Sequence, residues 1–249
     1  MDRTIPPAAA LMLNDIASYE APKGYDTVYA NKMAQMPKPL TSMTLDAVIA
    51  DGPRRTKLFG SSACGRYQFM TATLQDLRKT LVLMGTDLFT PDLQDRLALQ
   101  LLKRRGYDKF MAGKMTLTAF GLAIAQEWAS FPVLAPCKGA SRQIVRGQSY
   151  YAGDGLNKAL VKPEAVEAML RNAFATNSLD VALGNVAVNT PNPAPIVIGP
   201  KLDLPPTPAA PTPSPPTTSP GVAVVDTRNI FQRIADRLRT AFPITQKDA

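Results

Sequence analysis

The sequence predicts an α+β fold that is mainly α, with a small β element, a Pro-rich linker and a C-terminal amphipathic helix. Apolar residues recur at helical spacing behind helix-start signals over most of residues 1–175. The run Gly24–Tyr29 is rich in β-forming residues and predicts one short strand. Residues 191–220 contain twelve of the 23 prolines, a composition typical of an extended linker.

Start and stop signals place each predicted element in turn. The first helix should begin at Pro7, because proline suits the first helical position, and end near Glu20, before Pro22 and Gly24. Residues 54–59 should lead into a loop, Ser61–Arg66, that enters a helix within 67–71. The other helices are predicted to start after Thr44 (ending at Gly52–Pro53), after Thr90 (closed by Gly106), at Thr116 and at Pro163.

Three segments follow from this pattern. Residues 1–175 form a globular domain, residues 176–225 a Pro-rich disordered linker, and residues 226–249 an amphipathic helix and tail. In the tail, Ile230, Ile234, Leu238 and Phe242 share one stripe, with four arginines on the other faces. Because a lone helix of this length is marginal in water, it should dock on an anionic membrane surface or a partner protein, or pack back on the domain.

The charge and composition of the chain limit the classes of binding partner that suit it. The net charge of +8 and the pI near 9.6 suit nucleic acid, an anionic membrane or an anionic wall polymer, or serve solubility alone. No nucleic-acid-binding signature is present, so we expect no nucleic-acid partner. No apolar run is long enough to span a membrane, and the N-terminus lacks a signal-peptide pattern, so synthesis in the cytoplasm is expected.

The chain contains no histidine and two cysteines, Cys64 and Cys137. This composition excludes a Ser-His-Asp triad, a Cys-His pair and a His-ligated zinc ion, and the cysteine pairing stays open. Acid/base chemistry must then fall to Asp, Glu, Tyr or Lys, and we expect neither a metal nor a cofactor.

Glu20 is the candidate acid, because it lies at a helix end just before a turn, beside apolar residues that could raise its pKa. A glutamate at a helix end can equally be a solvated residue. Asp26 is a second carboxylate or a turn residue. The loop Ser61–Met70 is small, polar and glycine-containing, and suits one wall of a ligand groove. Tyr150 and Tyr151 lie in a second such loop, Gly147–Gly155.

Several motifs occur together and in order: Glu20, Gly65-Arg66-Tyr67-Gln68, Gln94-Asp95 and Trp128-Ala129-Ser130-Phe131-Pro132. With them, residues 10–160 resemble the lambda-type phage endolysins, which are lytic transglycosylases of the lysozyme-like superfamily. The sequence departs from that pattern at Ala21-Pro22 and in an insertion-like stretch, Val133–Arg146.

The resemblance implies a two-lobed lysozyme-like fold that cleaves the β-1,4 bond between N-acetylmuramic acid and N-acetylglucosamine in bacterial peptidoglycan. Glu20 would be the acid, and no cofactor would be needed. The resemblance leaves open whether the enzyme is a lytic transglycosylase or a muramidase, which release different products. Substrate-binding residues would be Ser62, Arg66, Tyr67, Gln68, Tyr150, Tyr151 and Asp26, although Arg66 could instead brace its loop.

The resemblance also implies where the protein would act. It would be made in the host cytoplasm and reach the periplasm and cell wall through a separate holin, or be carried in a phage particle. The alternative function is a non-catalytic structural or adaptor protein of the virion that keeps a lysozyme-like fold. The linker and the terminal helix favour that alternative, since they could dock the chain on a virion protein.

Overall fold

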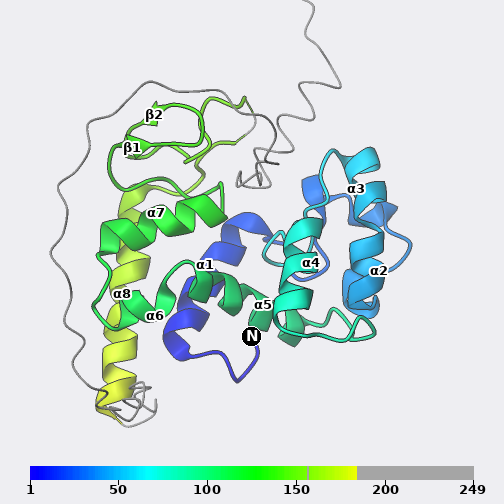
Figure 1. Cartoon of the computed structure of the whole chain (residues 1–249), viewed down its shortest axis with the longest axis horizontal. Coiled ribbons are helices and arrows are strands. Elements are labelled where there is room, and N and C mark those ends of the chain that lie inside the picture. The colour runs from blue at the N-terminus through cyan, green and yellow to red at the C-terminus, as the bar shows by residue number, and fades with distance from the viewer. Residues whose placement is uncertain (156, 184–249) are drawn as a thin grey trace, which may run out of the picture.

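The computed structural model describes residues 1–155 and 157–183 and is mainly helical with a small two-stranded sheet, as predicted (Figure 1). The α-helices are α1 (Pro7–Glu20), α2 (Leu45–Ala50), α3 (Gly52–Phe59), α4 (Thr71–Thr80), α5 (Pro91–Arg104), α6 (Tyr107–Met111), α7 (Leu117–Glu127) and α8 (Pro163–Ala182). The antiparallel strands are β1 (Cys137–Lys138) and β2 (Gln143–Ile144), and three short 3-10 turns are η1 (Tyr29–Asn31), η2 (Met33–Gln35) and η3 (Leu40–Ser42).

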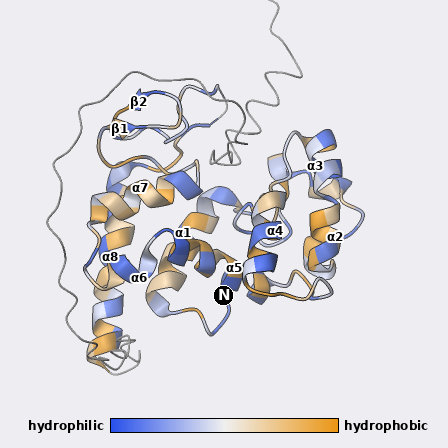
Figure 2. Cartoon of the chain, in the orientation of Figure 1, coloured by the Kyte–Doolittle hydropathy of each residue, from blue (hydrophilic) through white to orange (hydrophobic). Residues whose placement is uncertain are grey.

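Helix α1 lies at the centre of the arrangement and packs against both α8 and α5 (Figure 1). Helix α7 packs on α8, and the β1–β2 hairpin lies beyond α7. On the other side, α2 contacts α3 and α4. Hydrophobic stretches mark α7 and α8 in Figure 2, and these helices share one continuous core with α1. Burial of these apolar faces is the main stabilising contribution.

Threonine caps fix three helix starts where the sequence predicts them. The hydroxyl oxygens of Thr44, Thr90 and Thr116 each accept a hydrogen bond from the backbone N–H three residues later. Such a cap satisfies one of the otherwise unpaired N–H groups of the first turn. Proline at the first position of α1, α5 and α8 confirms the predicted starts of those helices as well.

The β prediction was wrong in position. Within Gly24–Tyr29 only Val28 makes a β-bridge, to Cys64, and the chain then turns through η1 with left-handed φ angles of 56° at Ala30 and Asn31. The two-stranded sheet instead lies at Cys137–Ile144, inside the insertion-like stretch. Its strands are two residues long, too short to produce a recognisable alternation of apolar and polar residues.

Two further local predictions were wrong. Gly52-Pro53 begins α3 instead of only ending α2, because glycine permits a close approach to Thr71: a Cβ at Gly52 would lie 1.9 Å from its Oγ1. Tyr67–Met70 does not begin α4. The chain reverses at Gly65 and Gln68, which have φ of 77° and 50°, so that Cys64 and Phe69 pair in a β-bridge.

Helix α8 continues to Ala182, so residues 176–182 are helical and not part of a linker. The remainder of the predicted linker and the predicted helix at 226–249 lie outside the described residues. Within the described ranges, no helix is long and apolar enough to cross a membrane. Cys64 and Cys137 are both free thiols, and Cys64 is fully buried.

Candidate functional site

A cavity of about 700 Å³ opens beside the C-terminal end of α1. Its walls come from five segments: the end of α1, the turn at η1, the loop 60–68 and two stretches near residues 130 and 158. The described lining residues are Tyr19, Glu20, Pro22, Thr27, Val28, Tyr29, Ala30, Asn31, Gly60, Ser61, Ala63, Gln68, Ala129, Ser130, Asn157, Lys158 and Leu160. A space of this size accommodates sugar rings.

Glu20 is the last residue of α1 and lines this cavity. The Ser130 hydroxyl donates a hydrogen bond to Oε1 of Glu20. Burial raises the pKa of Glu20 to about 7, and hydrogen bonds from the Ser130 hydroxyl and backbone N–H oppose that rise. At neutral pH a large fraction of Glu20 is therefore protonated and able to donate a proton.

The cavity wall contains strained backbone. Four non-glycine residues among those described have left-handed φ angles, and three of them, Ala30, Asn31 and Gln68, line the cavity. Such conformations cost free energy, persist only where the surrounding structure holds them, and cluster at ligand-binding sites. The Gln68 amide donates to the Gly65 carbonyl at 2.9 Å, which fixes its side chain against the loop.

Helix α5 braces two of the loops that shape the cavity. Asp95, fully buried, accepts hydrogen bonds from the Tyr67 hydroxyl at 2.6 Å and the Tyr25 hydroxyl at 3.1 Å. The side-chain oxygen of Gln94 accepts from the Arg66 backbone N–H at 2.9 Å, and its amide donates to the Tyr25 carbonyl at 3.1 Å. These bonds join the turn after Glu20 to the Gly65–Gln68 turn.

Glu20 and Gln68 are the sequence-predicted site residues that line the cavity. Tyr67 is 1% exposed, so its ring packs in the core and does not face the cavity. The Ser62 hydroxyl oxygen accepts from the Thr71 backbone N–H, and that side chain is buried as well. Arg66 acts as a brace, because it donates to the Tyr25 hydroxyl at 2.9 Å and to Asn14 Oδ1 at 2.8 Å.

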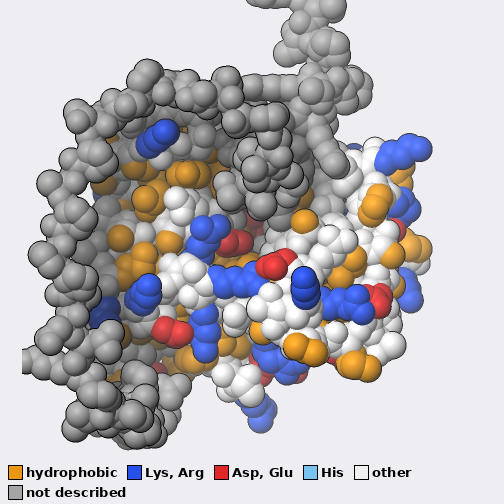
Figure 3. Space-filling model, viewed as in Figure 1, with side chains coloured by type: hydrophobic (Ala, Val, Ile, Leu, Met, Phe, Trp, Pro, Cys, Tyr) orange, Lys and Arg blue, Asp and Glu red, His pale blue; other side chains and the backbone are white. Residues whose placement is uncertain are grey.

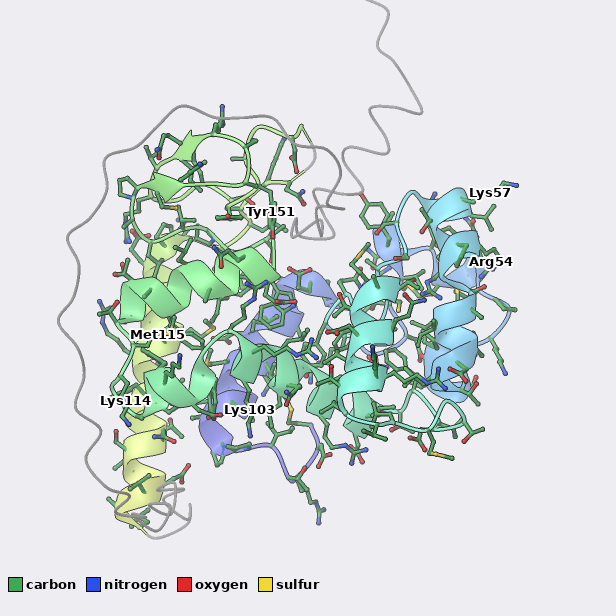
Figure 4. All side chains as sticks on the ribbon, in the orientation of Figure 1. Arg54, Lys57, Lys103, Lys114, Met115 and Tyr151 are labelled. Carbon is green, nitrogen blue, oxygen red and sulfur yellow. The ribbon has the colours of Figure 1, made fainter. Side chains whose placement is uncertain are left out.

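The remaining three candidates also lie outside the described lining. Tyr151 is buried next to α7, where its hydroxyl donates to the Gln126 carbonyl at 2.7 Å (Figure 4). Tyr150 packs edge-to-face against Tyr151 with 5.1 Å between ring centroids. Asp26 Oδ1 accepts from the Thr41 backbone N–H at 2.8 Å, the contact of a turn residue.

Most of the lining residues were not predicted as site residues, among them the polar residues Ser130, Asn31 and Lys158. Ser130 lies within the Trp-Ala-Ser-Phe-Pro motif, so the motif could have indicated it as a site residue. Asn31 and Lys158 lie in stretches without a motif. Among the described lining residues Glu20 is the one carboxylate. The described residues contain no cluster of three His, Cys, Asp or Glu side chains that could hold a metal ion.

Comparison with known proteins gives one match. A family model described as Endolysin matches residues 14–156, which is more than half of the chain. No curated protein and no solved structure matches. The matched range contains Glu20, Gln68, Gln94-Asp95 and Ser130, and therefore most of the cavity and its support.

Proposed function

This chain belongs to the endolysin family of phage enzymes that lyse the peptidoglycan wall, and we propose that it does so as a glycosidase with Glu20 as the acid. The observation that supports this most strongly is the placement of Glu20 in the cavity with its pKa raised to about 7. A carboxylic acid that stays protonated near neutral pH can donate to the oxygen of a glycosidic bond.

The proposed substrate is the β-1,4 bond between N-acetylmuramic acid and N-acetylglucosamine. Glu20 gives its proton to the bridging oxygen while the bond to the muramyl carbon breaks. The acetamido group of the muramyl sugar stabilises the positive charge at that carbon. Glu20, now a carboxylate, then removes a proton from the muramyl 6-hydroxyl, whose oxygen closes a 1,6-anhydro ring, or from a water that attacks instead.

The first of these outcomes is a lytic transglycosylase and the second a muramidase. Because Glu20 is the one carboxylate among the described lining residues, a mechanism that needs a single carboxyl group is favoured. An enzyme with two catalytic carboxylates would hold the second within about 10 Å of the first. A single carboxyl group serves both outcomes, so the choice between them rests on the resemblance of the ordered motifs to the lambda-type endolysins. On that basis we propose the transglycosylase reaction in a lysozyme-like fold of two lobes.

A glycosidase is also favoured over other wall-cleaving activities by composition. The chain contains no histidine, so amidase or peptidase chemistry that relies on a His-ligated zinc ion or a Cys-His pair has no histidine to use.

The experiment compares the parent protein, Glu20→Gln and Asp15→Asn on isolated peptidoglycan. Asp15 is an exposed carboxylate on the same helix, outside the cavity, and controls for the loss of a charge. We expect Glu20→Gln to lower the clearing rate at least about 100-fold, since the acid contributes that much in such enzymes, and Asp15→Asn to match the parent.

Mass spectrometry of the products then identifies the reaction, because an anhydro end is one water lighter than a reducing end. Equal clearing by Glu20→Gln and the parent would refute the acid assignment. A folded parent protein that clears no wall at any pH would favour the non-catalytic virion role.

A further inference from the structure

Lys158 is the one Lys or Arg among the described residues that line the cavity. Its side chain is exposed and makes no hydrogen bond or ion pair with any other described residue. Elsewhere on the described surface, Lys and Arg side chains are spread widely (Figure 3), and several of the arginines pair with a carboxylate. Lys158 is therefore an available cation inside the cavity of the proposed acid.

The backbone around Lys158 is anchored on both sides. The Asn157 backbone N–H donates to Asp154 Oδ1 at 2.8 Å, and the Leu160 backbone N–H donates to the Ser130 carbonyl at 2.7 Å. Ser130 is the residue whose hydroxyl donates to Glu20. The segment that bears Lys158 is thus fixed to the same residue that orients the acid.

Lys158 and Glu20 line the same cavity but do not form an ion pair. The influences that set the Glu20 pKa are burial and hydrogen bonds from Ser130, with no contribution from a lysine. An ammonium group in contact with Glu20 would lower the pKa of that carboxyl and oppose its role as an acid. The Lys158 ammonium group is therefore not in contact with the Glu20 carboxyl group.

The two sugars of the proposed substrate differ in charge-bearing groups. N-acetylglucosamine is neutral, whereas N-acetylmuramic acid carries a lactyl ether whose carboxyl group is either free or joined to a peptide with carboxylates of its own. A cation beside the cleavage point can distinguish these sugars by binding a carboxylate.

We propose that Lys158 is a specificity-determining residue that binds a carboxylate carried by the muramyl sugar of the glycan strand. This inference rests on the proposed function, and it makes the charge of the lactyl or peptide substituent the feature that selects peptidoglycan over neutral polymers of N-acetylglucosamine.

The test uses the full chain with Lys158→Gln, Lys158→Arg and Lys114→Gln. Lys114 is an exposed lysine between α6 and α7, away from the cavity, so its loss matches the change in net charge (Figure 4). Two anionic substrates are cleaved: strands with peptide stems, and strands freed of stems by an amidase, which bear lactyl carboxylates. Binding to both and to a neutral N-acetylglucosamine oligosaccharide is measured in the Glu20→Gln background.

We expect Lys158→Gln to raise KM for anionic strands about fivefold with little change in kcat, as for a partly exposed ion pair. Binding to anionic strands should weaken equally and depend less on ionic strength, while binding to the neutral oligosaccharide stays unchanged. Lys158→Arg and Lys114→Gln should match the parent. A defect confined to stem-bearing strands identifies a peptide carboxylate, and one confined to stem-free strands identifies the lactyl carboxylate. A defect shared by both shows that Lys158 binds either carboxylate.

Unchanged binding of anionic strands by Lys158→Gln, or an equal loss for the neutral oligosaccharide, would overturn the inference. Failure of the parent to cleave any strand would instead refute the proposed function. The binding comparison still decides the role of Lys158 in that case, because it uses an inactive background.

Discussion

Burial and hydrogen bonds from Ser130 together set the pKa of Glu20, and with it the expected working pH range. The Ser130 hydroxyl donates to the Glu20 carboxylate and stabilises the charged form, so it partly offsets the rise caused by burial and the resulting pKa is about 7. Because the protonated acid is the active form in the proposed mechanism, kcat/KM should fall as the pH rises through about 7.

Ser130→Ala should move this alkaline limb to higher pH. The substitution removes a donor to the ionised carboxylate, so the Glu20 pKa rises, and a bond of about 1.5 kcal/mol to a charged group corresponds to roughly one pH unit. The measurement is kcat/KM against pH for the parent and the variant. A limb that stays in place or moves to lower pH would show that the hydroxyl does not bond the carboxylate in solution.

The sequence singled out Glu20, the proposed acid, but not its surroundings. A glutamate at the end of an apolar helix, before a proline, was visible as a candidate, whereas the donor that tunes it lies 110 residues away. Tyr67 was predicted as a substrate-binding residue because it lies in a small polar loop. In the structure its hydroxyl donates a hydrogen bond to buried Asp95 on α5, and the side chain packs in the core. Neither outcome follows from local pattern, because each depends on a partner distant in sequence.

At the level of elements, α5 supports the site without lining it. Asp95 is a positioning residue, since it contacts Tyr67, Tyr25 and Arg66 and not the cavity. Asp95→Asn should lower the free energy of unfolding by about 2–3 kcal/mol, because Arg66 loses a buried counter-charge.

The same variant should also reduce kcat/KM by displacing the turns beside Glu20, while the alkaline pKa stays near that of the parent. Thermal unfolding and a pH profile of the folded variant measure the two effects. Asp46→Asn is the matched control, because Asp46 is exposed and pairs with Arg78 on the surface. A stable Asp95→Asn protein with parental kcat/KM would show that α5 has no positioning role.

Element starts were predicted where a side chain signals them and missed where a tertiary contact decides them. Threonine caps and first-turn prolines mark α2, α5, α7 and α8 from the residues alone. Helix α3 begins at a glycine because Thr71 lies against it, and that contact exists only in the folded chain.

At the scale of the whole molecule, we propose that the catalytic domain ends within α8. The last buried residue of this helix is Ala173, although the helix continues to Ala182. Chains cut after Ala175 or after Leu183 should therefore both cleave isolated peptidoglycan at the parental rate. What should fall is killing of whole cells, or retention on membranes or particles, since residues 226–249 are proposed to dock there.

Both cuts are compared with the full chain by rates on soluble glycan strands and by killing of cells. Loss of cleavage by the chain cut after Leu183 would show that residues beyond 183 belong to the catalytic fold. Loss only with the shorter chain would place residues 176–183 within it.

The rate at which the buried Cys64 thiol is labelled should report how often the cavity wall opens. Its backbone bridges both Val28 and Phe69, Arg55 donates to its sulfur, and burial raises its pKa to about 11. A thiolate is the form that reacts with labelling reagents, so Cys64 should react only when the wall opens, while the partly exposed Cys137 reacts at once. The rate of the slow labelling phase therefore measures how often the wall opens. Bound glycan that holds the site closed should lower this rate.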